Sequence, residues 1–166
     1  MKKGLFAVVV VAIIGFAAAV FFGRGSGTPA LHNLPSEYEG LKQVVLADGD
    51  DGLKAIDKLH GKSIKVTHGY KVTYAGGGEE VTVWGAGTDS EDDAVALLME
   101  MVNRMNVNTN MPFTKPVVFK YGDYTLYYSE GMGAKHYYYA KGKLVFWIEL
   151  TTPREADLMD KILRDF

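Results

Sequence analysis

The side chains best suited to metal chemistry lie in a short segment flanked by glycines. Gly131 to His136 contains a methionine, Met132, and a histidine, and four further methionines lie between positions 99 and 111. Thioether and imidazole groups suit Cu(I). However, the chain has no cysteine, its four histidines share no metal-ligand spacing, and methionines at helical spacing usually fill a core. We therefore predict no metal and no cofactor, and keep a small-molecule or metal-binding sensor around the Met132–His136 loop as the alternative function.

Two patterns that resemble catalytic motifs lack their defining residues. Ser129, His136 and a carboxylate would make a hydrolytic triad, but the chain has no G-x-S-x-G elbow. Gly85-Ala86-Gly87 precedes a helix as a phosphate loop would, but a third glycine is missing and the acidic residues at 89–93 would repel a phosphate. A hydrolase-type enzyme is therefore the weakest interpretation, and no catalytic residue is assigned.

Aromatic residues concentrate between Tyr121 and Trp147. This region holds seven of the ten tyrosines, one of the two tryptophans and His136. A hairpin turn at Lys141-Gly142 would place Tyr139 opposite Leu144 and Tyr137 opposite Phe146. We predict that this face of the hairpin belongs to the hydrophobic core.

The reverse face of the same sheet is also apolar. The turn would set Tyr138 opposite Val145 and His136 opposite Trp147, and the preceding hairpin would place Val118 opposite Tyr127. Exposed apolar patches of this kind mark binding sites, unless another segment such as 36–45 covers them. The predicted binding residues are Tyr127, His136, Tyr138 and Trp147.

Hydrophobic periodicity predicts an α+β fold. Gly61 ends the first helix, Ser90 caps the second with Asp93 able to reach back to it, and Thr152 caps the third with Glu155 in a capping box. The residues from 36 to 50 stay unassigned. The order α-ββ-α-ββ-ββ-α predicts a mostly antiparallel sheet of about six strands with helices packed on one face. The predicted elements are helices at 51–60, from Ser90 and from Thr152, and strands at 63–74, 80–86, 116–121, 124–129, 134–140 and 143–150.

An apolar run at the N-terminus predicts a membrane anchor. As a helix, residues 5–22 would span roughly 27 Å at about 1.5 Å per residue, close to the thickness of a bilayer core. Lys2 and Lys3 precede the run and Arg24 alone follows it, which favours a cytoplasmic N-terminus and an extracytoplasmic domain. Ala17-Ala18-Ala19 offers a cleavage site, so a removable signal peptide is the alternative.

The string from Val8 to Ala19 also resembles the N-terminal helix of type IV pilins. Those proteins carry a glutamate five residues after the processed glycine, and counting from Gly4 that position is Val9. This difference favours a plain signal anchor over pilin-like assembly.

These features together predict a single-pass cell-membrane protein. Residues 1–24 form the signal-anchor helix, residues 25–36 a Gly-, Ser- and Pro-rich tether, and residues 37–166 the extracytoplasmic domain. A net charge of -2 without a basic cluster argues against nucleic acid as a partner. We expect a binding or interaction module, a possible subunit of an envelope complex, whose partner is another protein or a second copy of the chain.

Overall fold

The computed structural model describes residues 34–166. The predicted anchor and residues 25–33 of the predicted tether lie outside the described residues. Between residues 34 and 166, none of the helices combines the length and apolar character that a bilayer crossing requires.

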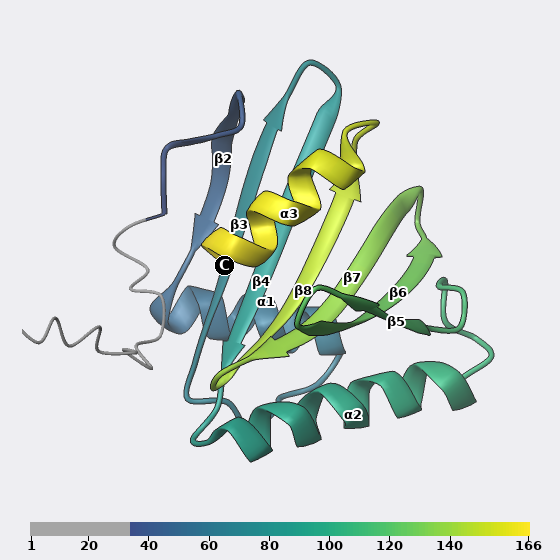
Figure 1. Ribbon diagram of the computed structural model, residues 1–166. Coiled ribbons are helices and arrows are strands. Elements are labelled where there is room, and N and C mark those ends of the chain that lie inside the picture. Colours follow the sequence, from purple (N-terminus) through teal and green to yellow (C-terminus); the bar gives the residue numbers. More distant parts are fainter. Residues whose placement is uncertain (1–33) are drawn as a thin grey trace, which may run out of the picture.

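The described residues form one antiparallel sheet of eight strands, in the order β1-β2-β3-β4-β8-β7-β6-β5, and three helices (Figure 1). The α+β class and the mostly antiparallel sheet are confirmed. The predicted number of six strands is too low, because the unassigned segment supplies two strands at one edge. The strands are β1 (Glu37–Tyr38), β2 (Leu41–Ala47), β3 (His68–Gly76), β4 (Glu79–Gly87), β5 (Val117–Tyr121), β6 (Tyr124–Gly131), β7 (Ala134–Lys141) and β8 (Leu144–Thr151), and the helices are α1 (Gly49–His60), α2 (Glu91–Val107) and α3 (Glu155–Asp165).

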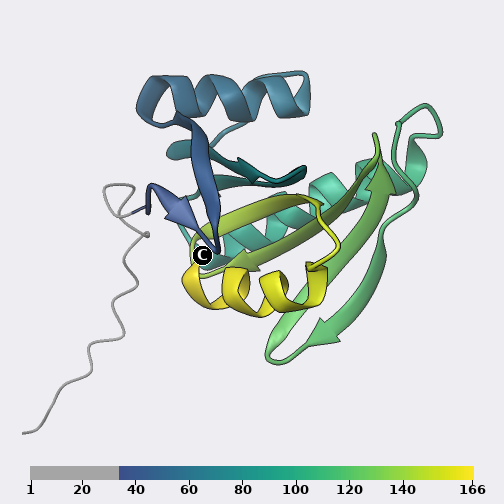
Figure 2. The ribbon, with the colours of Figure 1, turned by 90° about the horizontal axis from the view of Figure 1, so that it is seen from above.

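Helices cover both faces of this sheet. Figure 2 shows α1 and α3 on opposite sides of the strands. One buried cluster joins α3 to the sheet through Ile162 and Phe146, and a second joins α1 and α2 to the other face through Ile56 and Trp147. The prediction that all helices pack on one face is therefore wrong, because the central strands are apolar on both sides and each side requires its own cover.

The hairpin between β7 and β8 turns one residue later than predicted. Lys141 pairs with Leu144, so Gly142 and Lys143 form the turn, and Gly142 has the positive φ of 56° that such turns require. Tyr138 therefore lies opposite Trp147, and His136 lies opposite Glu149. Each pairing shifts by two residues, an even number, so every side chain keeps its predicted face.

The helix starts show which local signals the fold uses. The Ser90 hydroxyl accepts the Asp93 amide hydrogen at 3.1 Å, which confirms the predicted cap of α2. The predicted capping box of α3 is wrong. The helix begins at Glu155 itself, and the Glu155 carboxylate accepts hydrogen bonds from Lys135 and Tyr137 on the sheet instead.

Two glycines set how closely α1 approaches the sheet. A Cβ atom on Gly52 of α1 would lie 1.9 Å from the backbone oxygen of Gly69 in β3. A Cβ atom on Gly69 would lie 2.8 Å from the Ile56 side chain. The backbones of α1 and β3 thus meet in direct contact, which only glycine permits.

We therefore expect Gly52→Ala to lower the free energy of unfolding by at least about 1–3 kcal/mol, the usual range for overpacking a core. Urea denaturation monitored by tryptophan fluorescence measures this change. Lys54→Ala, on the exposed side of α1, is the control and should change stability by less than about 0.5 kcal/mol. Equal unfolding midpoints for the two variants would show that the close contact is not required.

Candidate binding groove

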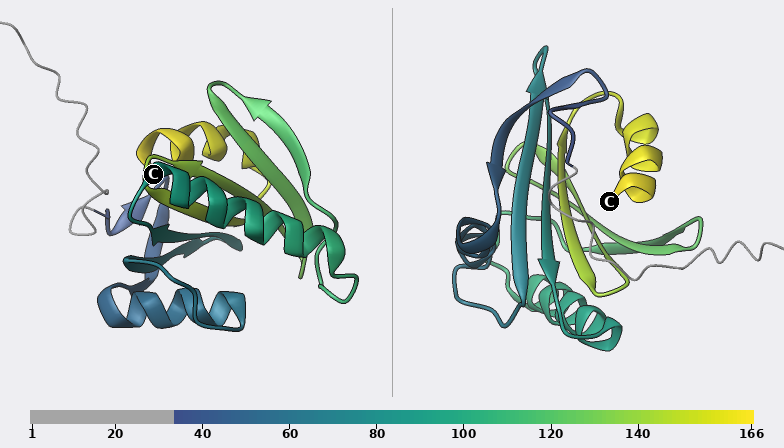
Figure 3. Two further views of the ribbon diagram at one scale, coloured as in Figure 1. Left: turned by 90° about the horizontal axis from the view of Figure 1, so that it is seen from below. Right: turned by 90° about the vertical axis from the view of Figure 1, so that its left-hand side faces the viewer.

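The two helices on the same face of the sheet lie apart and leave a groove between them. α1 packs on β3, whereas α2 packs on β7 and β8 (Figure 3). The space between the helices has a volume of about 810 Å³, within the range of about 300–1,000 Å³ typical of small-molecule sites. We call it the α1–α2 groove. Its walls come from α1, α2, the segments that follow each helix, and Met132.

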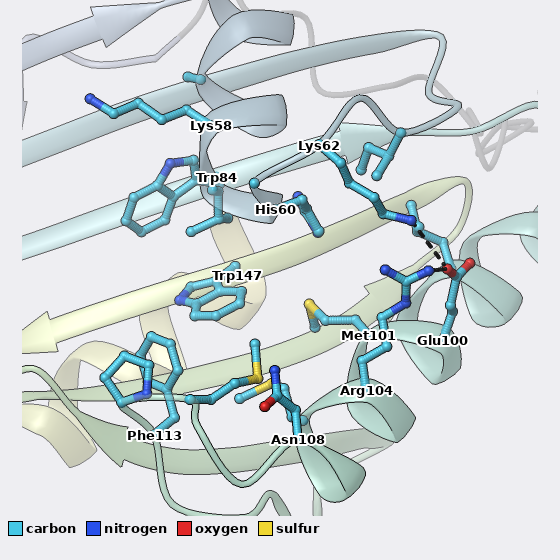
Figure 4. Close-up of a pocket in the computed structure, with 18 of the residues that line it drawn as sticks. Lys58, His60, Lys62, Trp84, Glu100, Met101, Arg104, Asn108, Phe113 and Trp147 are labelled. Carbon is cyan, nitrogen blue, oxygen red and sulfur yellow. Dashed lines mark ion pairs between the residues drawn. The ribbon is translucent and has the colours of Figure 1, made fainter.

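Aromatic rings form the floor of the groove (Figure 4). Trp84 of β4 and Trp147 of β8 are direct cross-strand partners, and their ring centroids lie 6.5 Å apart in an edge-to-face arrangement. Phe113 extends this row, with its ring centroid 5.5 Å from that of Trp147. The two tryptophans are the only ones in the chain. Each keeps 7–8% of its surface exposed, so both rings are rigidly packed and still reachable from the groove.

A buried histidine fixes the orientation of Trp147. The Trp147 indole N–H donates to His136 Nδ1 at 3.1 Å, and His136 Nε2 lies 3.0 Å from the Gly131 carbonyl oxygen. A carbonyl only accepts, so Nε2 carries the hydrogen and Nδ1 is the acceptor for the indole. His136 is 1% exposed, and both of its nitrogens are used. It acts as a positioning residue beneath the groove.

The segment after α2 closes the groove on one side. Phe113 pairs with Gly131 through an isolated bridge, and its ring lies edge-on to His136 with centroids 4.9 Å apart. A Cβ atom on Gly131 would lie 2.3 Å from the Pro112 carbonyl oxygen. The absence of a side chain at Gly131 thus lets this segment lie against the sheet and brings Phe113 beside Trp147.

Charged side chains surround the aromatic floor, and most of them are cationic. Lys58, Lys62, Lys71 and Arg104 line the groove, whereas Glu100 is the single carboxylate among the described residues that line it. Lys71 Nζ lies 5.0 Å from the centroid of the Trp84 ring, in a cation–π arrangement. Glu100 lies between two of the cations, 2.6 Å from Arg104 and 3.6 Å from Lys62. The groove therefore combines an apolar floor with a positive rim.

The structure places the four predicted binding residues at different depths. His136 and Tyr138 are fully buried, Tyr138 in the cluster that includes α2 and His136 against the Phe113 ring. Tyr127 is half-buried and its hydroxyl lies 3.2 Å from the Met99 sulfur on α2. Trp147 alone lines the groove. The segment from 36 to 45, named above as one that could cover this face, instead contributes β1 and β2 to the sheet edge.

Sequence reasoning did not identify Trp84, Phe113 or the cationic rim. Trp84 joins Trp147 only because β4 pairs with β8, two strands that lie far apart in the chain. One signal was available for Trp84, since residues 79–87 could be recognised as a strand with a large aromatic side chain on one face. No local pattern reveals the position of Phe113, which depends on the path of a loop.

The residues considered for catalysis do not assemble. Ser129 forms a hydrogen bond with the Tyr138 hydroxyl, not with His136. Burial raises the pKa of Tyr138 far above its ordinary value, so this hydroxyl stays protonated and cannot serve as a base. Gly85, Ala86 and Gly87 belong to strand β4 and do not form a loop.

The Met132–His136 segment also differs from a ligand-presenting loop. Only Met132 and Gly133 lie in the turn between β6 and β7, and His136 points into the protein beneath the groove. Within residues 34–166, no group of three histidine, cysteine or acidic side chains is arranged to hold a metal ion.

Comparison with known proteins gives no relative: no protein family, curated protein or solved structure matches the chain.

The role of His136 can be tested by mutation. His136→Ala should lower the free energy of unfolding by about 1–3 kcal/mol or more, because it leaves the buried Trp147 N–H without an acceptor. Tryptophan fluorescence during urea unfolding measures both the stability and the environment of the indole. Glu149→Gln is the control, since Glu149 lies 3.9 Å from His136 Nδ1 and carries no part of this hydrogen-bond chain. If Glu149→Gln were the more destabilising variant, the His136–Glu149 pair would be the important contact.

Proposed function

We propose that the domain is a binding module for a small, largely apolar molecule that lies in the α1–α2 groove. The observation that carries this proposal is the aromatic floor: Trp84, Trp147 and Phe113 line one concave site of suitable volume. Largely apolar pockets with a few polar groups at the edge are the usual form of ligand sites.

The covering of the aromatic face favours a small ligand over a large partner. A continuous exposed aromatic face would offer a protein a flat area to bind. Instead, α2 packs over Tyr138 and the Phe113 ring packs against His136, so neither ring is available to a partner, whereas Trp147 lines the groove. Trp147 keeps its predicted binding role in this proposal, and Trp84 and Phe113 join it.

A protein partner or a second copy of the chain is the second candidate. The observation in its favour is the edge strand β5, where Val117 and Val118 are 61% and 56% exposed. Exposed apolar side chains on an unpaired strand edge favour strand-to-strand pairing. Together with the predicted signal anchor, either candidate describes a membrane-anchored extracytoplasmic binding module.

Energy transfer from tryptophan tests the ligand site directly. N-phenylnaphthylamine is a neutral apolar dye that absorbs where tryptophan emits, and both tryptophans line the groove. We expect saturable energy transfer to the dye. Ala55→Phe, which places a ring in the wall of the groove, should lower the affinity for the dye at least about ten-fold by filling the space that the dye needs.

The matched control is Ala156→Phe, which adds the same ring on an exposed position of α3. It should bind the dye as the unmodified protein does. A site in the groove would be contradicted if both variants weakened the energy transfer to the dye equally. It would also be contradicted if the unmodified protein showed no saturable energy transfer.

A further inference from the structure

We propose that the ligand of the α1–α2 groove is a single-chain amphiphile with a carboxylate head. Its head would bind between Lys62 and Arg104, and its hydrocarbon tail would lie on Trp147 and Trp84. This inference rests on the proposed function, because it names the chemistry of the molecule that the groove takes.

The charge of the side chains that line the groove indicates an anionic ligand. Four cationic side chains face one carboxylate, which leaves an excess of three positive charges around a site with an apolar floor. A low-dielectric floor strengthens the field of these charges inside a concave site. A neutral ligand would leave this charge without a partner, and a cationic one would be repelled by it.

Glu100 shows where a carboxylate fits. Its Oε1 atom forms ion pairs with Arg104 of α2 and with Lys62 of the segment after α1 (Figure 4). Two cations from different elements therefore converge on one carboxylate oxygen. All three side chains are about half exposed. Ion pairs at such exposure contribute little stability. A ligand carboxylate can therefore compete with Glu100 for these cations without a large cost to the fold.

Two features of the groove would favour a cation instead, and the balance of charge outweighs them. The C-terminal turns of α1 and α2 both line the groove, and their carbonyl ends carry a partial negative charge of about half a unit each. Trp84 also offers a ring face for a cation, but Lys71 already occupies it. Lys58 and Arg104 lie in those last helical turns and offset their dipoles, while Lys62 and Lys71 add positive charge from outside both helices.

The apolar side chains of the groove suit a hydrocarbon tail. Met101 projects between the charged end and the tryptophans, and Met105 and Met111 also line the site (Figure 4). Methionine side chains adapt to flexible apolar chains, and aromatic rings give them a firm surface. A linear hydrocarbon chain would thus run from the cations across Met101 to the aromatic floor.

A matched series of ligands tests the head group. Decanoate, decanol and decyltrimethylammonium share one tail and differ in charge. Each is used as a monomer, below its micellar concentration or, for decanol, below its solubility limit. We expect decanoate to displace N-phenylnaphthylamine at concentrations at least about ten-fold lower than the other two. Arg104→Ala and Lys62→Ala should weaken decanoate several-fold and leave decanol unchanged, whereas Glu100→Gln should strengthen decanoate. Lys65→Ala removes a nearby exposed cation that does not line the groove, and it should have no effect.

Other outcomes overturn the inference in distinct ways. If the dye binds but the three ligands displace it equally, or decyltrimethylammonium displaces it best, the proposed ligand site in the groove is supported. The inference that its ligand has a carboxylate head is then wrong. If the dye itself does not bind, the proposed function fails with it. If Arg104 and Lys62 affect only cosedimentation with phosphatidylglycerol vesicles and not decanoate binding, the cations recognise a membrane surface and not a monomeric amphiphile.

Discussion

The structure depends on one constraint: the central strands are apolar on both faces. Tyr138 and Tyr139 are neighbours in β7, point to opposite sides of the sheet, and are both fully buried. Leaving either face in water would expose large aromatic surfaces, so the chain must supply helices on both sides. α3 covers one side, and α1 and α2 share the other. The position of the groove follows from how that cover is divided.

α1 and α2 do not cover their face of the sheet completely, and the space left between them is the candidate site. Gly52 and Gly69 hold α1 tightly against β3, while α2 lies over β7 and β8. Side chains of α1 and α2, such as Ile56 and Met101, pack around Trp84 and Trp147 where β4 meets β8, and leave 7–8% of each tryptophan exposed. Their remaining exposure is therefore a consequence of helix placement. Beneath the sheet surface, His136 holds the Trp147 indole by its N–H, so the floor has a defined shape before any ligand arrives.

Local patterns in the sequence predict the elements well, while long-range pairing limits the rest. The Ser90 cap follows from its residue type and position, and the faces of Tyr137 and Tyr138 follow from periodicity. The faces survive a two-residue shift in the pairing because side chains alternate along a strand. The cover of the aromatic face could not be predicted, since nothing in α2 itself specifies the strands on which it packs. The meeting of Trp84 with Trp147 depends likewise on β4–β8 pairing.

Methionine methyl resonances give the most direct test of the central claim, that ligands occupy the space between α1 and α2. Four methionines line the groove, Met101, Met105, Met111 and Met132, whereas Met159 belongs to α3 and packs on the opposite face of the sheet. Decanoate should be titrated into protein whose methionine methyl groups carry an NMR label. We expect saturable shifts for the groove methionines, with Met159 unchanged. Shifts confined to Met159, or no shift at a decanoate concentration that displaces the dye, would contradict it.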